Sequence, residues 1–440
     1  MASISILHFL FCFFLLVLSS ESTTQTQSHS QSQQNSNSKP NLLVLPVQQD
    51  ANTGLHWAYI HKRTPLMQLP VLIDLNGKHL WVNCEQHYSS STYQAPFCHS
   101  TQCARANTHT CHTCVSSFRP GCHNNTCGLM SANPVTQQTA LGELAQDVFA
   151  IYTTRGPKLG PMVTVPQFLF SCAPSFLAQK GLPNNVQGVA GLAHSPISLP
   201  NQLSSHFGLK HQFTTCLSRY PKSNGAIIFG DAANNMRFGN NRNYKNNPNI
   251  LNNLIYTPLT ITPEGEYRMH VTSIQINEHT VVPVSGSMLS SYPEGVIGGT
   301  LISTSIPYTT LQDSLFETFV QVFAKQFPKE AQVNAVGPFG LCFDSKRINK
   351  AVNVEFVLDR SDVVWRISGE NLMVEAKSGI SCLGIVNGGL KPKATISIGS
   401  RQLEENLLLF DLVESKLGFS NSLSSRGIKC SDLFDFNNNA

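Results

Sequence analysis

The chain has 440 residues, of which 41% are hydrophobic, 13% are charged and 9% are aromatic. This composition indicates a large folded protein with two domains or lobes, and it excludes a disordered chain. The formal net charge is +4, and the Lys and Arg residues are scattered instead of forming a basic stripe interleaved with aromatics. We therefore expect no nucleic-acid binding, whereas weak attraction to acidic polysaccharides or acidic partners fits the charge.

The N-terminus has the character of a secretory leader. An apolar run from Ile4 to Leu18 is followed by small serines, and it is too short for a comfortable membrane span. We assign residues 1–22 to a signal peptide and expect the Gln/Ser-rich residues 23–40 to be disordered. No later run is long enough to cross a bilayer, so we expect an exported protein without a membrane partner.

From residue 41 onward the chain predicts a mostly β structure. Short apolar runs such as Phe168–Cys172 and Val271–Ile276 are separated by Gly, Pro and Asn. The stretch from Val71 to Cys84 contains two such runs, and between them Asp74 enters an Asn-Gly turn at the end of a buried strand. One segment, Leu311 to Phe327, repeats apolar residues at helical spacing before Pro328, which predicts a helix with a packed phenylalanine face.

The cysteines predict disulfides and no metal. Of 13 cysteines, Cys12 lies in the leader, and the even number that remains in an exported chain suggests six disulfides. Six of them crowd into residues 98–127, where Cys111-x-x-Cys114 with nearby histidines would by itself be compatible with zinc. The exported context favours disulfides instead. The cysteines concerned are Cys84, Cys98, Cys103, Cys111, Cys114, Cys122, Cys127, Cys172, Cys216, Cys342, Cys382 and Cys430.

Other motifs are few. Asn124-Asn-Thr126 is an acceptor for N-glycosylation, which we expect at Asn124 in an exported protein. The chain has no Gly-x-Ser-x-Gly nucleophile elbow, no phosphate-binding Gly-x-x-x-x-Gly-Lys and no His-Glu-x-x-His zinc motif. We therefore predict no cofactor and no resident metal.

Several ordered motifs resemble the pepsin-like aspartic proteases of plants. Asp74-Leu-Asn-Gly before Leu80-Trp-Val-Asn-Cys is similar to their first active-site loop, and Gln187–Leu192 is similar to the strand that supports it. Gly225–Asp231 and Leu409–Ser420 resemble a later hairpin and the closing strands. The resemblance implies a mostly β, bilobal fold with a central cleft. We place the N-terminal β-lobe at 41–255, with a disulfide knot at 98–127, and the C-terminal β-lobe at 256–440.

The same resemblance implies a broken catalytic site. Proteases of this fold use two carboxyls that share one proton around a water. Asp74 fills the first position, but Ser303 stands where the second Asp is expected and Ser305 replaces a glycine. Leu75 takes the place of a Thr or Ser, and the flap segment Met130–Val135 lacks a tyrosine. Loss of one acid–base partner costs about 10²- to 10⁴-fold in rate, so we expect no protease and no catalytic residues.

Within that family the chain is most similar to legume basic 7S globulins, gamma-conglutins and cell-wall glycosidase inhibitors. Asn41–Val47, Tyr93–Cys98 and Phe213–Ser218 carry this similarity. It implies a protein of the seed storage vacuole or the apoplast that forms homo-oligomers and is cut once into two disulfide-linked chains. We place the cut within 284–299. The resemblance also implies a Cys216–Cys430 bridge between the pieces and a Cys342–Cys382 bridge within the second lobe.

Three functions follow from this similarity. The first is a non-proteolytic seed globulin for storage or stress-released defence. The alternative is an inhibitor whose partners are microbial cell-wall-degrading glycoside hydrolases, such as xyloglucan endoglucanase or xylanase, and small peptides are further possible partners. An active aspartic endopeptidase is the third and weakest, because the dyad is incomplete.

Overall fold

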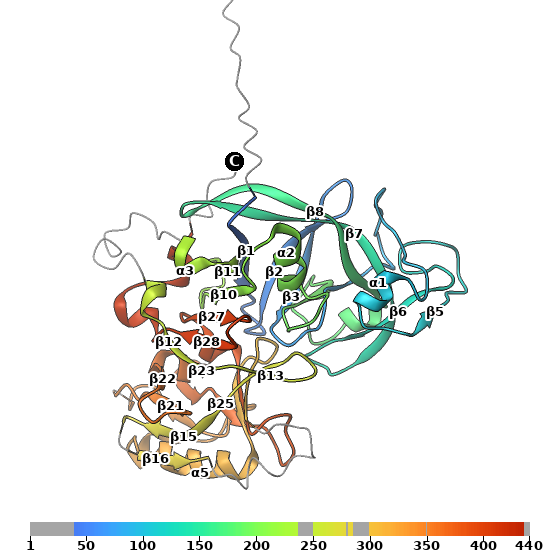
Figure 1. Ribbon diagram of the computed structural model, residues 1–440. Coiled ribbons are helices and arrows are strands. Elements are labelled where there is room, and N and C mark those ends of the chain that lie inside the picture. The colour runs from blue at the N-terminus through green and yellow to red at the C-terminus, as the bar shows by residue number, and fades with distance from the viewer. Residues whose placement is uncertain (1–38, 236–249, 279, 285–298, 349, 435–440) are drawn as a thin grey trace, which may run out of the picture. The chain divides into compact units, whose positions relative to one another are not determined.

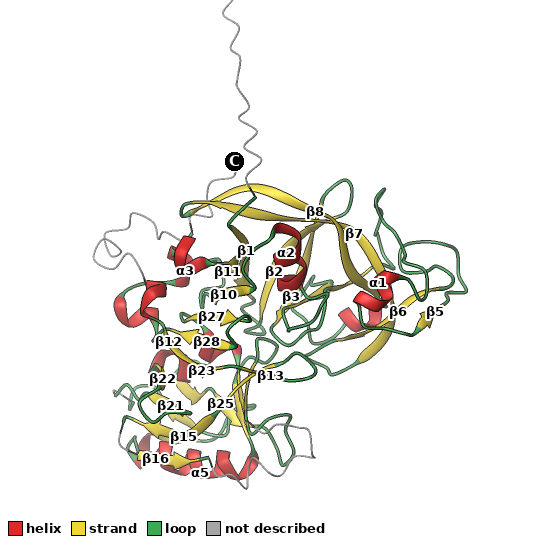
Figure 2. Cartoon of the chain, in the orientation of Figure 1, coloured by secondary structure: helices red, strands yellow, loops and turns green. Residues whose placement is uncertain are grey.

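The computed structural model describes residues 39–235, 250–278, 280–284, 299–348 and 350–434. The predicted signal peptide at 1–22, almost all of the predicted disordered N-terminus and most of the predicted cut segment lie outside these residues. From Lys39 onward the chain forms one compact unit. Strands dominate it, and the helices are few and short (Figure 2). The mostly β class predicted from the sequence is confirmed.

A 14-stranded sheet contains most of the first half of the chain and, at one end, two strands from its last residues. The antiparallel partners β7 and β8 are its longest strands, with 17 and 16 residues. In sheet order the strands are β12 (Ile255–Pro258), β28 (Lys416–Phe419), β27 (Leu407–Asp411), β10 (Gln212–Cys216), β11 (Gly225–Gly230), β1 (Leu42–Gln49), β2 (His56–Lys62), β3 (Met67–Asp74), β9 (Gly188–Gly191), β4 (Trp81–Asn83), β8 (Lys158–Ala173), β7 (Thr139–Arg155), β6 (Thr126–Ala132) and β5 (Cys111–His112).

Three smaller sheets hold the rest of the second half. A six-stranded sheet has the order β13 (Thr260–Ile261), β14 (Tyr267–Met269), β17 (Thr300–Ile302), β26 (Ile396–Ile398), β18 (Thr309–Leu311) and β25 (Ile385–Asn387). The two four-stranded sheets are β16 (Thr280–Pro283), β15 (Val271–Ile276), β21 (Val354–Leu358) and β22 (Val364–Ile367), and β19 (Gln332–Val333), β20 (Cys342–Asp344), β24 (Ile380–Leu383) and β23 (Met373–Lys377).

The helix predicted for 311–327 is present in a shorter form, α5 (Asp313–Ala324). Leu311 belongs to strand β18, and the Gln312 side chain caps the helix by accepting from the Ser314 backbone N–H. The other α-helices are α1 (Thr101–Arg105), α2 (Leu199–Phe207), α3 (Ala232–Asn235), α6 (Gly369–Leu372) and α7 (Ser400–Leu403). Short 3₁₀ turns occur at Ser175–Ala178, Ile250–Asn253, Lys329–Ala331, Leu423–Arg426 and Cys430–Asp432.

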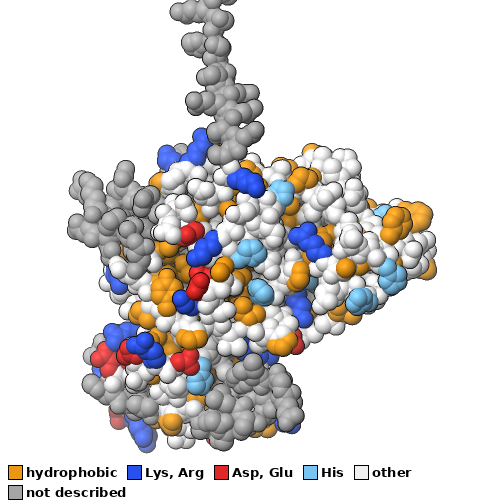
Figure 3. Space-filling view, in the orientation of Figure 1, with side chains coloured by type: hydrophobic (Ala, Val, Ile, Leu, Met, Phe, Trp, Pro, Cys, Tyr) orange, Lys and Arg blue, Asp and Glu red, His pale blue; other side chains and the backbone are white. Residues whose placement is uncertain are grey.

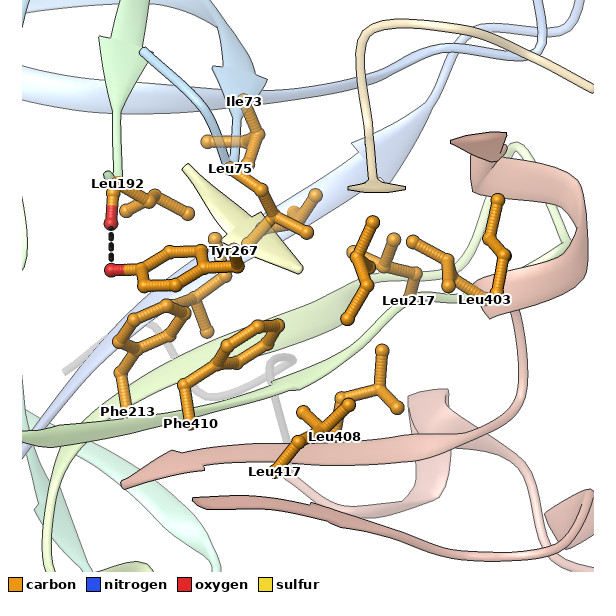
Figure 4. Packing of buried hydrophobic residues seen from close by; sticks show 14 of the residues in the cluster. Ile73, Leu75, Leu192, Phe213, Leu217, Tyr267, Leu403, Leu408, Phe410 and Leu417 are labelled. Atoms are coloured by element: carbon orange, nitrogen blue, oxygen red, sulfur yellow. Dashed lines mark hydrogen bonds between the residues drawn. The ribbon is translucent and has the colours of Figure 1, made fainter. Parts of the chain in front are cut away.

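One large apolar core joins the first and second halves of the chain. At its centre the rings of Phe213 and Phe410 stack with centroids 4.7 Å apart, and Tyr267 packs against both (Figure 4). The Tyr267 hydroxyl donates to the carbonyl of Leu192 at 2.8 Å, so this buried polar group is satisfied. Residues from three distant parts of the sequence thus share one packed centre.

The structure pairs the twelve cysteines of its described residues in six disulfides, the number expected from the sequence. Three of them lie inside the knot at 98–127, and a fourth links the end of β4 to β8. Cys216–Cys430 and Cys342–Cys382 are the pairings that the family resemblance implies. The remaining pairs are Cys84–Cys172, Cys98–Cys111, Cys103–Cys127 and Cys114–Cys122.

Candidate functional site

Asp74 is the last residue of β3, and its side chain is buried, with 5% of the residue exposed. Strand β3 runs parallel to β9, with Asp74 opposite Gly191. The backbone N–H of Asn76 donates to the Asp74 carboxylate at 3.1 Å, and the N–H of Leu192 donates to the Asp74 carbonyl at 2.9 Å. The buried strand therefore delivers the carboxylate into a fixed turn, as the sequence predicts.

The turn after Asp74 is possible because two glycines meet there. A Cβ on Gly191 would lie 2.3 Å from the carbonyl oxygen of Gly77, and one on Gly77 would lie 2.9 Å from the Gly191 Cα. Either contact is shorter than carbon and oxygen atoms tolerate, so a side chain at either position would push the turn away from β9. The close approach holds the Asp74 backbone in place.

The second half of the chain repeats this arrangement. Strand β9 lies between β3, to which it is parallel, and β4, to which it is antiparallel. In the same way β26 lies between β17, to which it is parallel, and β18, to which it is antiparallel. The turn that follows β17 begins with Ser303, whose backbone N–H donates to Ile398 at 2.9 Å. Ser303 and Asp74 thus occupy similar places at the ends of two strand–turn–strand units.

Three hydrogen bonds join the two turns. The Thr304 hydroxyl donates to the carbonyl of Ile73 at 2.8 Å and accepts from the N–H of Leu75 at 3.1 Å. In the opposite direction, the side-chain amide of Asn76 donates to the carbonyl of Ile302 at 2.9 Å. Sequence reasoning did not single out Asn76, although a polar side chain next to a glycine turn is a usable signal.

Leu75 follows Asp74 in the first turn, as Thr304 follows Ser303 in the second. Of the two, only the Thr304 side chain hydrogen-bonds to the opposite turn. Leu75 is fully buried in the apolar core near Ile73 and Tyr267, as Figure 4 shows. It has no hydroxyl with which to bond the opposite turn. The neighbouring Asn76 amide makes that bond instead, so the turns remain cross-linked in both directions.

The immediate partners of the Asp74 carboxyl include a hydroxyl. The Ser305 side chain hydrogen-bonds to Asp74, and the Ser305 and Ser303 hydroxyl oxygens are 3.1 Å apart. Burial raises the pKa of Asp74 to about 6, and the Asn76 backbone N–H, the charge of Lys393 and the Ser305 bond act in the opposite direction. A serine hydroxyl does not ionise at neutral pH, so neither serine shares a proton with Asp74 in the manner of a second carboxyl.

A second acid, Glu266, is near enough to raise the pKa of Asp74 slightly by its charge. Its carboxylate is already paired, with Lys393 and with the Arg268 guanidinium at 3.3 Å. Glu266 is therefore bonded to two cations and does not form a carboxyl pair with Asp74. Sequence reasoning did not identify this ion-pair cluster beside the turn.

The hairpin of β6 and β7 contains the predicted flap segment Met130–Val135. Met130 is 57% exposed, whereas Asn133 is fully buried and donates its side-chain amide to the carbonyl of Leu177 at 2.7 Å. The Trp81 indole N–H, just after the Asp74 turn, donates to the carbonyl of Ala132 at 2.9 Å. These bonds tie the hairpin to the body of the protein.

The knot offers one grouping of potential metal ligands in the described part of the chain, formed by Cys98, His99 and Cys111. The two sulfurs are joined to each other in a disulfide, so they are not thiolate ligands. Asn124 is exposed on the same knot, where an acceptor must lie to be glycosylated. Glycosylation there stays a prediction. Among the described residues, no helix has the length and apolar character to span a membrane.

A mostly β chain with two such strand–turn–strand units joined at their turns defines a bilobal protein of the pepsin-like aspartic protease fold. The xylanase inhibitor N-terminal family matches residues 57–231, and the xylanase inhibitor C-terminal family matches residues 266–421. The Glycine max protein basic 7S globulin 2 is 64% identical over 402 residues, which cover 90% of this chain and 91% of that protein.

A second relative, gamma conglutin 1 of Lupinus angustifolius, is 65% identical over 410 residues, 91% of this chain and 90% of the relative. The crystal structure of conglutin gamma, a basic 7S globulin from lupine seeds, matches with a TM-score of 0.83 and 63% identity. That match covers 91% of this chain and 100% of the solved one. The chain belongs to the family of basic 7S globulins and gamma-conglutins.

Proposed function

We propose that the protein is an exported, non-proteolytic seed globulin that stores nitrogen and sulfur or is released under stress. The observation that carries the proposal is the environment of Asp74, whose hydrogen-bond partners are the Ser305 hydroxyl and the Asn76 N–H instead of a second carboxyl. Ser303 takes the place of the second catalytic Asp in this proposal. The two relatives cited above support it, because one is named a globulin, the other a conglutin, and neither is named a protease.

The loss of catalysis has a direct test. The mature protein should not cleave a denatured protein substrate at acid pH, where this class of dyad works. The double change Ser303→Asp with Ser305→Gly restores the second carboxyl but leaves Leu75 and the flap as they are, so we expect at most weak cleavage. Clear cleavage by the unchanged protein would overturn the proposal.

The storage role has a separate test in the plant. We expect the protein to accumulate in maturing seed and to disappear during germination, in the storage vacuole or the apoplast. Quantitative immunoblotting of seed stages, with fractionation of these compartments, measures this. Absence from seed would rule out storage without changing the conclusion about catalysis.

Inhibition of microbial glycoside hydrolases is the second candidate function. The observation that favours it is the match of both halves of the chain to the two xylanase inhibitor families. Inhibition would depend on exposed loop side chains that enter the target's cleft, and not on Asp74. Rate assays of fungal xylanases and xyloglucan endoglucanases with micromolar protein decide the matter, and unchanged rates across the panel would exclude it.

The remaining expectations belong to the same proposal. An exported globulin of this family is expected to form homo-oligomers, to lose residues 1–22 and to be glycosylated at Asn124. Mass spectrometry of the purified seed protein checks the N-terminus and the glycan together, and gel filtration checks the oligomer. Small peptides are further candidate ligands, which the same purified protein allows one to screen.

A further inference from the structure

The knot has an unusual charge composition. Between Glu85 and Glu143 the chain contains no Asp, Glu or Lys, but it contains two arginines and five histidines. Among these basic residues, His99, His109 and Arg105 are exposed on the knot, and His112 is half-buried. This stretch therefore offers guanidinium and imidazole groups, and no acid, to a partner.

The two arginines of the knot have no acid beside them in the described part of the chain. Neither Arg105 nor Arg119 forms an ion pair with an acid among the described residues, and the buried Nη1 of Arg119 has no hydrogen-bond partner there. Arg105 is exposed and the Arg119 side chain as a whole is half-buried, so their charges stay open to a partner from outside.

The two acids next to the knot, Glu143 and Glu85, already have hydrogen-bond partners. Glu143 of β7 is fully buried, accepts from the Tyr93 hydroxyl and from the Gly121 N–H at 3.1 Å, and pairs with the His123 ring at 3.0 Å. Glu85, which precedes the knot, accepts from the Ser175 N–H at 3.0 Å. Of the histidines, His123 therefore has an acid beside it. His99 faces the Cys111 sulfur at 3.6 Å, and the knot's helix α1 adds the cation Arg105.

Apolar side chains are also exposed in the knot and directly before it. Phe97 and Phe118 are 71% and 72% exposed, and Val115 is completely exposed. Phe118 stacks on His123, with ring centroids 5.9 Å apart, and most of its surface stays exposed. In the space-filling view, orange side chains and pale-blue histidines gather at the end of the molecule where β5 is labelled in Figure 1 (Figure 3).

We propose that the knot binds a carboxylated polysaccharide, a polymer of uronic acids. The carboxylates pair with Arg105 and Arg119, because charge-assisted bonds of this kind are the strong ones, and they accept further hydrogen bonds from the histidine rings. The apolar C–H faces of the sugar rings pack on Phe97 and Phe118, as apolar faces do on exposed aromatic rings. Cations spread over an open surface fit an extended polymer with repeated charges better than a single small anion.

The disulfides make this surface suitable for a polymer. Three of them close loops inside the knot, so Phe97, Phe118 and the cations are held in place before the ligand arrives. A surface that is already ordered loses less conformational entropy on binding. The contacts are individually weak and exposed, so affinity comes from several of them along one chain.

The test is binding of the full mature protein to immobilised polygalacturonate by biolayer interferometry. We expect Arg105→Gln combined with Arg119→Gln to weaken binding about tenfold, because the charge-assisted contacts are lost. Combined His99→Gln, His109→Gln and His112→Gln changes should weaken binding by a smaller factor. Phe118→Ala should also weaken it, because an apolar contact to the sugar ring is removed.

The controls separate this surface from general charge. Lys222→Gln with Lys346→Gln, two exposed lysines outside the knot, should leave binding unchanged. Asn124→Gln shows whether a glycan on the knot limits access. A fully methyl-esterified polymer, which lacks the charge, should not bind. Thermal unfolding of each variant checks its fold.

Two results would overturn the proposal. One is polygalacturonate binding that does not change in the arginine, histidine and Phe118 variants, or no binding of polygalacturonate at all. The other is equal capture of polyglutamate with no effect of Phe118→Ala, which would assign the surface to acidic proteins instead.

Discussion

At the residue scale, Asn76 explains how the two turns stay joined although the first one has lost a hydroxyl. Thr304 makes its bond to Ile73 through a side-chain oxygen, and Leu75, its counterpart, is committed to the core. The Asn76 amide reaches the carbonyl of Ile302 instead. Without this bond the carbonyl oxygen of the buried residue Ile302 would lose this partner, and an unpaired buried acceptor lowers the free energy of unfolding.

We therefore expect Asn76→Ala to lower the free energy of unfolding by about 1–3 kcal/mol, the cost of leaving a buried acceptor unpaired. Denaturant unfolding followed by fluorescence measures this. Gln86→Ala removes an exposed side-chain amide and is the matched control, with an expected change within about 0.5 kcal/mol. Equal stability of both variants would show that the Asn76 bond contributes nothing.

The raised pKa of Asp74 gives a second prediction. Because the folded-state pKa of about 6 lies above the ordinary aspartate value of 3.8, folded Asp74 holds its proton more tightly than Asp74 in the unfolded chain. The associated stability is fully present below about pH 4 and is lost as the pH rises through about 6. Asp74→Asn removes this titration, so its stability relative to the unchanged protein should improve from pH 4 to pH 7 by roughly 3 kcal/mol.

Unfolding curves of both proteins at several pH values check this second prediction. The comparison across pH matters, because the new amide also changes the bonds to Asn76 and Ser305 by an amount that does not depend on pH. Ser303→Ala is a suitable control, since it removes a hydroxyl of the same turn without removing a titrating group. A stability difference that stays constant between pH 4 and pH 7 would contradict the assigned pKa.

The sequence predicted part of this site for clear physical reasons. A buried apolar run that ends at Asp74 before Asn-Gly has few alternatives to a strand and a tight turn, and the structure has both. The bond from Asn76 to Ile302 joins residues more than two hundred positions apart. No local pattern carries such a contact, and the same holds for the pairing of Glu266 with Lys393.

At the scale of elements, α5 shows what periodicity does and does not predict. Its apolar positions were identified correctly, and Leu315, Phe319 and Phe323 are fully buried. Its ends were placed too far out, because Leu311 and Phe327 are buried as well, the first of them in strand β18. Apolar spacing reports which side chains face the core and is silent about whether the backbone there is a helix or a strand.

Phe319→Ala tests the importance of this face. Phe319 is fully buried and stacks near Phe323, with centroids 5.7 Å apart, so truncation leaves a cavity. We expect the free energy of unfolding to fall by about 3–5 kcal/mol. Glu317→Ala, on the exposed side of the same helix, should change it by less than about 0.5 kcal/mol. Calorimetry of the two variants decides, and a small effect of Phe319→Ala would mean that the core closes around the gap.

At the scale of the whole molecule, the sheet pairings show that the halves depend on each other. Strand β27 pairs with β10, and β28 pairs with β12, so the last strands of the chain complete the sheet of its first half. The family resemblance led to the right fold class, but strand order across the sheet follows from long-range pairing that composition and periodicity do not encode.

A chain cut within 284–299 should therefore stay together in two ways. The pairings of β10 with β27 and of β12 with β28 cross the cut, and so does Cys216–Cys430. None of the other five disulfides crosses the cut, because four lie before it and Cys342–Cys382 lies after it. After cleavage at a protease site engineered into this segment, denaturing gels should show one band without reductant and two bands with it.

Replacement of single cysteines isolates the bridge that holds the cut chain. The Cys430→Ser variant, once cut, should run as two bands without reductant, because sheet pairing does not survive denaturation and no other covalent link joins the pieces. Under native conditions the same variant should still elute as one species in gel filtration, since the paired strands bury the shared core. Cys382→Ser breaks a disulfide within the second piece and should leave a single unreduced band. If the cut Cys382→Ser protein separated and the Cys430→Ser protein did not, the bridge between the pieces would be assigned to the wrong pair.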